Sequence, residues 1–172
     1  MSPEERQRYS EWYARAAPLL EQKKWGEALR DAPTLDLEPA QPYQLSMPLR
    51  QTTVALVSSA GISGPGQPPM DGQHPEGDYS IRVLDVNAPI SELRVWHTHF
   101  DTSFAREDIN VVYPIDRLKE LAAEGVIGGV ATHAVSFMGY FSNVYRIRDE
   151  VVPAVVAAVK DAGADAVVLV PV

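Results

Sequence analysis

The stretch Trp96–Asn110, WHTHFDTSFAREDIN, holds the residues whose types and spacing could do chemistry. His97 and His99 stand at alternate positions, so in a strand both imidazoles would point to the same face. With Asp101 they would offer two nitrogens and one carboxylate, a set that suits zinc or iron. An organic-substrate site and a polar loop with a structural histidine fit the same short pattern, so the spacing alone leaves these alternatives open.

A second polar group follows the histidines. Arg106 offers a planar fork that suits a substrate carboxylate, and three polar neighbours could support it: Glu107, Asp108 and Asn110. The group lies between a predicted strand and the apolar segment VVYPI, so we expect it to line the mouth of a site. The alternative is a solvated surface cluster, which would contribute little to stability.

Two glycine-containing segments could form the remaining walls. In open α/β sheets, ligands bind beyond the carboxyl ends of strands, and SSAGISGPG follows a predicted strand. Its hydroxyls and backbone amides could hold a carboxylate or phosphate, through Ser58, Ser59 and Gly61. The segment THAVSFMGYFSN (132–143) alternates small and aromatic residues around Gly139, with Ser136 and Tyr140 as hydroxyl donors. It predicts either a pocket wall or core packing. Neither segment contains a GxGxxG, P-loop or GxSxG motif.

Composition narrows the class of protein. The chain has 172 residues, no cysteine and a formal net charge of −8. Without cysteine, these residues contain no disulfide, thiolate zinc site or cysteine nucleophile. The negative charge argues against nucleic acid or an anionic membrane surface as a partner. The charged start is unlike a secretory signal, and no apolar run approaches the roughly 20 residues that span a bilayer. We therefore expect a cytoplasmic protein.

The N-terminal region predicts helices followed by a connector. From about Ser2 to Asp31, aromatic and aliphatic residues recur at spacings of three and four, which favours an amphipathic helix. Pro18 is expected to kink or divide it. Residues 31–50 contain four prolines and should form an extended connector without regular structure.

Beyond the connector, predicted strands alternate with predicted helices. This order is typical of an α/β fold, here an open three-layer sandwich with a mostly parallel sheet, preceded by the N-terminal helical extension. The final run, DAVVLVPV, is typical of a buried parallel strand. We expect residues 1–50 to form the helices and connector, and residues 51–172 the α/β domain. The predicted strands are 53–57, 80–86, 93–99, 126–131 and 165–172, and the predicted helices start at Asp116 and Arg148.

Three blocks together resemble the selenoprotein B family of glycine/sarcosine/betaine reductases. They are VALVSSAGI, HTHFDTSFAREDINVVYPIDRLKELAAEGVIGGVA and SFMGY. The layout is most similar to the short branch related to the D-proline reductase selenoprotein subunit. The resemblance spans about Thr53–Val172 and leaves the N-terminal helices outside it.

The resemblance implies an oxidoreductase of amino acid metabolism that reductively cleaves a carbon–nitrogen bond of a small amino-acid-like substrate. In such enzymes a selenocysteine or cysteine, a strong nucleophile at neutral pH, attacks the substrate, and thiols resolve the intermediate. The resemblance also implies a partner reductase subunit, which can carry a pyruvoyl group, and a thioredoxin-like electron donor. Association of the chain with copies of itself is a further expectation.

By the same resemblance, His97, His99 and Asp101 would be catalytic groups that orient substrate or transfer protons. Arg106 would hold a substrate carboxylate. Family members carry the selenocysteine or cysteine just beyond a strand such as VVLVPV, where this chain ends. We therefore expect a truncated chain, cut at a UGA codon that encodes selenocysteine. An in-frame continuation after an immediate UGA would support this expectation, and a UAA or UAG codon would contradict it.

Two other functions stay open at this point. One is a metal-dependent hydrolase or lyase that uses His97, His99 and Asp101 as ligands, with no other metal site predicted. The other is a non-catalytic subunit that binds a small molecule or acts as a scaffold.

Overall fold

The structure is a computed structural model that describes residues 1–172. Its centre is β1 (Thr53–Ser58), which pairs in parallel with β7 (Ala166–Val170) along one edge. Along the other edge β1 pairs in parallel with β5 (Gly129–Val130) and then with β6 (His133–Phe137). The outer strand β3 (Ile81–Asp85) runs antiparallel to β6. The sheet is open and mostly parallel, so the predicted α/β fold is confirmed.

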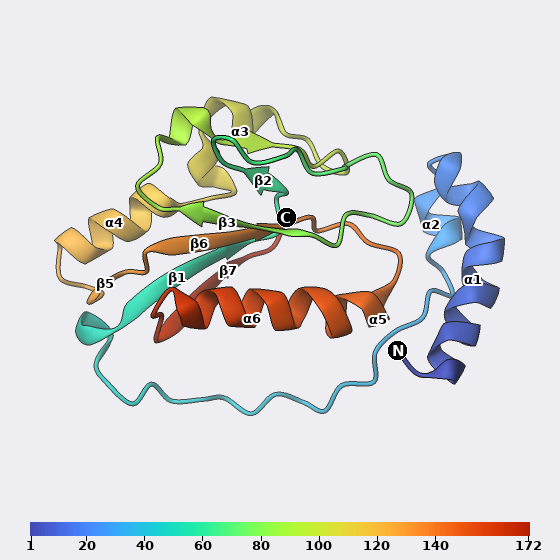
Figure 1. The fold of residues 1–172 in the computed structure, drawn as a ribbon, viewed down its shortest axis with the longest axis horizontal. Coiled ribbons are helices and arrows are strands. Elements are labelled where there is room, and N and C mark those ends of the chain that lie inside the picture. Colours follow the sequence, from blue (N-terminus) through green and yellow to red (C-terminus); the bar gives the residue numbers. More distant parts are fainter.

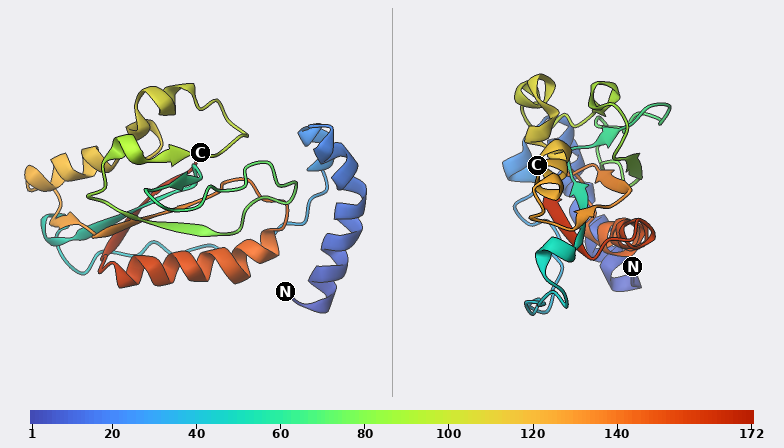
Figure 2. Two further views of the ribbon diagram at one scale, coloured as in Figure 1. Left: turned by 45° about the horizontal axis from the view of Figure 1, so that its top comes forward. Right: turned by 90° about the vertical axis from the view of Figure 1, so that its left-hand side faces the viewer.

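Helices cover both faces of this sheet (Figures 1 and 2). Alternate β1 side chains face opposite ways, because strand side chains have a period of two. Val54 and Leu56 pack in the main core with α4 (Ile115–Ala123). Ala55 packs on the other face with Ala162, at the end of α6 (Val152–Asp161). These contacts make the three layers that the sequence predicted.

The helix predicted from Arg148 starts earlier and is not uniform. It comprises α5 (Val144–Arg146), a π-helical turn (Ile147–Val151) and then α6. Asn143 caps the start of α5, since its side-chain oxygen accepts from the backbone N–H groups of Tyr145 and Arg146.

The last strand is parallel to β1, as predicted, but the prediction that it is buried is wrong. Val168 is 37% and Leu169 is 69% exposed. The reason is topological, because β7 is an edge strand and only β1 flanks it. Apolar β-branched composition predicts a strand, whereas its neighbours decide its burial.

Short elements above the sheet shape the loops at the carboxyl ends of the strands. The predicted strand 93–99 shrinks to β4 (Arg94–Val95), which pairs antiparallel with β2 (Ile62–Ser63). His97 and His99 therefore follow the strand in an irregular segment. The other elements here are one α-helix and two 3-10 helices: α3 (Ser103–Glu107), Ile90–Glu92 and Ile109–Val111.

The N-terminal helix α1 (Pro3–Glu21) begins with a capping box, in which Ser2 and Glu5 bond each other's backbone N–H groups. It continues through Pro18, so the predicted division there is wrong. The helix tolerates one missing backbone donor and ends at Glu21, and Lys23, just beyond the C-cap Gln22, has a left-handed φ of 58°. This conformation costs an L-residue about 1–2 kcal/mol. The short helix α2 (Trp25–Ala28) follows.

A second core cluster attaches these helices to the sandwich. Trp12 in this cluster is 3% exposed, and its indole N–H donates to the Ala28 carbonyl. The cluster also includes Tyr9 and Tyr145, the latter from α5. Glu5 adds an ion pair with Arg148 at 2.7 Å. As a result α1 stands across the end of the sandwich (Figure 1).

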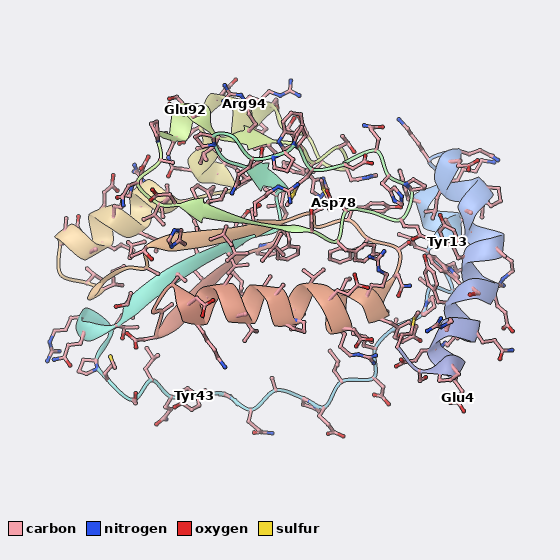
Figure 3. The ribbon with its side chains drawn as sticks, in the orientation of Figure 1. Glu4, Tyr13, Tyr43, Asp78, Glu92 and Arg94 are labelled. Atoms are coloured by element: carbon pink, nitrogen blue, oxygen red, sulfur yellow. The ribbon has the colours of Figure 1, made fainter.

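Residues 32–48 have no regular structure and run outside the sandwich, as predicted, until a 3-10 turn (Leu49–Gln51) leads into β1. Tyr43 on this connector is 86% exposed (Figure 3). No helix in the structure combines the length and the apolar composition that crossing a membrane requires.

Replacing Trp12 with alanine should release the N-terminal helices from the sandwich. The change removes a buried indole and its hydrogen bond, at a cost of roughly 3–5 kcal/mol. Hydrogen–deuterium exchange should show faster exchange in α1 and α2 while β1 stays protected. Tyr43→Ala is the matched control, because its ring is exposed. Unchanged α1 protection in Trp12→Ala would contradict this account of the docking.

Candidate functional site

Three separate sequence blocks meet at the carboxyl ends of the parallel strands. Ser59 follows β1, Gly139 follows β6, and Val172 follows β7. The backbone N–H of Val172 donates to Ser59 Oγ at 2.9 Å. A Cβ added to Gly139 would lie 3.0 Å from the Ser59 carbonyl oxygen and 3.1 Å from that of Val172. Glycine at position 139 thus permits this close approach.

Two of the predicted ligand-binding serines are used within the protein. Ser58 and Ser136 are fully buried. Ser58 Oγ donates to the Val112 carbonyl at 2.7 Å, and Ser136 Oγ accepts from the Ile62 backbone N–H at 2.8 Å. These bonds connect the end of β1 to Val112 and β6 to β2, so both side chains have a structural role.

Gly61 links this loop to the histidine segment. Its φ of 66° lies in the left-handed region, and a Cβ there would lie 2.9 Å from Met138 Cε. Its carbonyl accepts from the Trp96 backbone N–H at 2.9 Å. The structure therefore gives Gly61 a positioning role beside His97.

His97 is a buried, neutral histidine. It is 6% exposed, and its Nδ1 accepts from the His99 backbone N–H at 3.1 Å. In the neutral ring Nε2 then carries the proton, and this atom is buried without a hydrogen-bond partner. Burial, with a smaller effect from His99, lowers the pKa of His97 to about 4. This favours an orienting role for His97 over proton transfer at neutral pH.

His99 lies in an aromatic cluster with residues from two other segments. Its ring stacks on Tyr140 with centroids 3.9 Å apart, and it meets the Trp25 ring edge-on at 4.9 Å. Trp25 and Tyr140 are also in contact, at 5.4 Å. Burial lowers the pKa of His99, and the positive charge of Lys23 lowers it further. His99 is therefore neutral at pH 7.

This cluster forms part of the wall of an open cavity of about 930 Å³. The cavity lies between the α1–α2 turn and two loops of the sandwich. The first loop is 72–75 and the second is 98–101, and Tyr140 completes the wall. A hydrogen bond from the Thr98 hydroxyl to the Gly72 carbonyl joins the two loops. The volume suits a small organic ligand.

Of the predicted acidic and basic groups, Asp101 lines this cavity, whereas Arg106, Glu107, Asp108 and Asn110 do not. The Asp101 carboxylate accepts from the Ser103 backbone N–H, which lowers its pKa. Arg106, Glu107 and Asp108 line a separate hollow with Arg94. Asn110 instead bridges Asp108 and Asp116. The Arg106 guanidinium, which was predicted to bind a substrate carboxylate, thus lies outside the cavity. Arg106 is on α3, and it lines the separate hollow together with Ile90 and Ser91 of the 3-10 turn at 90–92.

The structure contains no group of three histidine, cysteine, aspartate or glutamate side chains placed to hold a metal ion. His97 Nδ1 is occupied by a backbone donor, His99 stacks on Tyr140, and Asp101 accepts from Ser103. These three side chains, the metal set considered from spacing alone, do not form a ligand set.

Lys23 and Trp25 are site residues that the sequence pattern missed. Both line the cavity, although they lie about 75 residues before His99. The residue spacing in this region predicts only an amphipathic helix. One local signal was available: a lysine stands just past the end of α1, where glycine is the usual residue.

The family model for glycine/sarcosine/betaine reductase selenoprotein B matches residues 15–172. The chain belongs to this selenoprotein B family. The match reaches further toward the N-terminus than the sequence resemblance did, since it includes residues 15–52 with Lys23 and Trp25. The N-terminal helices are therefore partly inside the family region.

Three relatives illustrate the family. D-proline reductase subunit gamma of Acetoanaerobium sticklandii is 33% identical over 121 residues, 70% of this chain and 49% of the relative. Glycine reductase complex component B subunit gamma of Carboxydothermus hydrogenoformans is 32% identical over 160 residues, 90% and 36% of the two chains. Sarcosine reductase complex component B subunit beta of Peptoclostridium acidaminophilum is 30% identical over 131 residues, 73% and 29%. The chain thus spans half or less of their length. No solved structure gives a significant match.

The burial of His97 makes stability depend on pH in a defined window. Its pKa is about 4 in the folded protein against 6.5 for an ordinary histidine. Below pH 6.5 the unfolded chain binds a proton that the folded chain does not, so stability falls as the pH falls toward 4. A shift of this size corresponds to about 3 kcal/mol at most.

His97→Asn should remove this part of the pH dependence, because the asparagine oxygen can still accept from the His99 N–H and does not titrate. Urea unfolding of both proteins at pH 7 and pH 4.5 measures the difference. His133→Asn, at an exposed histidine, serves as control. An equal loss of stability in all three proteins would show that His97 is not the titrating group.

Proposed function

We propose that this chain is a component of a selenoprotein-B-type reductase that cleaves the carbon–nitrogen bond of a small amino-acid-like substrate. The observation that carries the proposal is that the family blocks meet at the carboxyl ends of the strands, where Gly139 is followed directly by Tyr140, which lines the cavity together with His99 and Asp101. The relatives are named as subunits of D-proline, glycine and sarcosine reductases.

The proposed reaction is a two-electron reduction. The bond between the α-carbon and the nitrogen breaks, the α-carbon gains a hydrogen, and nitrogen leaves with its electron pair and a proton as an amine. For a cyclic substrate such as D-proline, the same cleavage opens the ring and both ends stay in one product. Two protons are consumed, and a dithiol supplies the two electrons as it becomes a disulfide.

The 172 residues contain no cysteine, so the soft nucleophile of this reaction is a thiol or selenol outside them. We place it at the carboxyl end of β7, as the family resemblance implies. Ser59 supports this position, because its hydroxyl holds the Val172 N–H, and Gly139 leaves room for close backbone approach. When present, the thiolate or selenolate would attack the α-carbon as nitrogen leaves with the bonding pair. A second thiolate would then attack the sulfur or selenium, so that its bond to carbon breaks, the α-carbon takes a proton, and the two chalcogen atoms end as a disulfide or selenenyl sulfide.

The chain's own residues bind and orient the substrate in this proposal. Asp101, whose pKa is lowered, is ionised at neutral pH and attracts a substrate ammonium group. His99 is neutral and lines the same cavity, so it can accept a proton. His97 is a positioning residue, since its Nδ1 fixes the His99 backbone.

Other subunits complete the enzyme in this proposal. The relatives' names describe parts of complexes, which supports a partner reductase subunit. A pyruvoyl group on that partner would activate the substrate nitrogen, and a thioredoxin-like protein would return the electrons.

His99→Gln and Asp101→Asn should each lower kcat/KM by roughly a hundredfold, the usual size for a group that transfers a proton or pairs with substrate. The variants would be made in a protein that also carries the proposed nucleophile beyond β7, reconstituted with partner subunits and a dithiol, and amine release from glycine, sarcosine and betaine would be measured. With D-proline, the measurement is formation of the ring-opened amino acid.

Matched controls lie outside the cavity: His133→Gln for the histidine, and Glu92→Gln for the carboxylate (Figure 3). Both controls should retain full activity. Tight assembly with substrate binding and no product would instead identify a non-catalytic subunit, and equal activity of all variants would remove the cavity from the mechanism.

A further inference from the structure

We propose that Lys23, at the turn between α1 and α2, binds the carboxylate of the substrate. This inference rests on the proposed function and adds a site residue from the N-terminal helices. The sequence pattern had pointed to Arg106 for this role, but Arg106 lines a different hollow. Among the residues that line the cavity, Lys23 is the one lysine or arginine.

The backbone at Lys23 explains how the side chain is presented. The Lys23 and Lys24 N–H groups bond the carbonyls of Leu20 and Leu19, each at 2.9 Å. These two bonds form a Schellman motif, which requires the left-handed conformation at Lys23. Glycine adopts that conformation without strain, whereas Lys23 is the one non-glycine residue of the chain with a positive φ. A strained conformation at a cavity wall points to a function for the side chain.

The ammonium group of Lys23 is available to a ligand. None of the ion pairs of the structure involves it, and it makes no side-chain hydrogen bond. Its charge acts on the site, because it contributes to the lowered pKa of His99. The chain has a net charge of −8, which repels anions in general. A lysine that lines the cavity would attract an anionic group of a ligand there.

The cavity also carries the complementary charge. Glu21 and Asp101 line it together with Lys23, so it offers carboxylates for an ammonium group and a cation for a carboxylate. The rings of Trp25 and Tyr140 also line the cavity, and aromatic rings attract alkylated ammonium groups and pack on aliphatic carbon. This combination fits a zwitterionic amino acid with a compact apolar body.

A lysine at this position has a simpler alternative role. A cation near the C-terminal end of a helix interacts favourably with the helix dipole. That role would be lost in Lys23→Gln as well, so stability alone does not separate the two. Lys23→Gly separates them, because glycine relieves the strained φ while it removes the ammonium group.

The test compares two probes that differ only in the carboxylate: D-proline and D-prolinamide. Binding to the isolated full chain is measured by titration calorimetry or NMR, with glycine, sarcosine and betaine as further carboxylate ligands. Lys23→Gly and Lys23→Gln should weaken D-proline binding by about tenfold or more, the value of a hydrogen bond to a charged group. D-prolinamide binding should not change, and Lys23→Arg should keep most of the affinity.

Two controls make the result specific. Lys24→Gln removes the same charge from the neighbouring residue, which does not line the cavity, and should bind D-proline like wild type. Lys23→Gly should have a Tm equal to or above that of wild type, so weaker binding would not reflect unfolding.

Three outcomes would overturn the proposal. The first is equal D-proline affinity of wild type and Lys23→Gly. The second is an equal loss for D-proline and D-prolinamide, which would show that the turn matters for packing alone. The third is no binding of any of the four carboxylate ligands by wild type. Turnover by the reconstituted complex is measured separately, so in each case the proposed reductase function would stand or fall on its own.

Discussion

The site depends on one constraint, the parallel hydrogen bonding of β1 to β6 on one side and to β7 on the other. Parallel strands have their carboxyl ends at the same end of the sheet, so residues more than 100 positions apart meet there. Ser59, Gly139 and Val172 lie within hydrogen-bonding or van der Waals distance for this reason. The buried hydroxyls of Ser58 and Ser136 bond backbone groups of Val112 and Ile62. The cavity is lined by other residues.

The second constraint is the docking of the N-terminal helices. The Trp12 cluster and the Glu5–Arg148 ion pair hold α1 against the sandwich, and this brings the α1–α2 turn to the 98–101 loop. The cavity exists between the two parts, so its shape depends on an interface much smaller than the main core. Binding of a ligand across this interface would stabilise the docked state by mass action. Binding of such a ligand would therefore favour the ordered, docked state of the N-terminal helices.

Burial and charge divide the roles of the two histidines. His97 loses its charged form because it is enclosed, and it uses one nitrogen to fix the backbone of His99. His99 stays at the cavity wall between aromatic rings, and a nearby lysine also favours its neutral form. His97 thus has a structural role, whereas His99 lines the cavity. Alternate spacing in a strand does not predict this difference.

Local periodicity and contiguous motifs were enough to predict the α/β class, the connector, the family and the strands β1, β3 and β7. They missed β6, because the segment 132–143 was predicted only as a pocket wall or core packing. The sequence by itself did not determine the exposure of β7, the separation of Arg106 from Asp101, or the course of α1 through Pro18. Those depend on sheet order, on the direction in which α3 turns, and on packing against α5. Lys23 reached the site only through tertiary docking, since no local pattern relates a helix end to a loop 75 residues away.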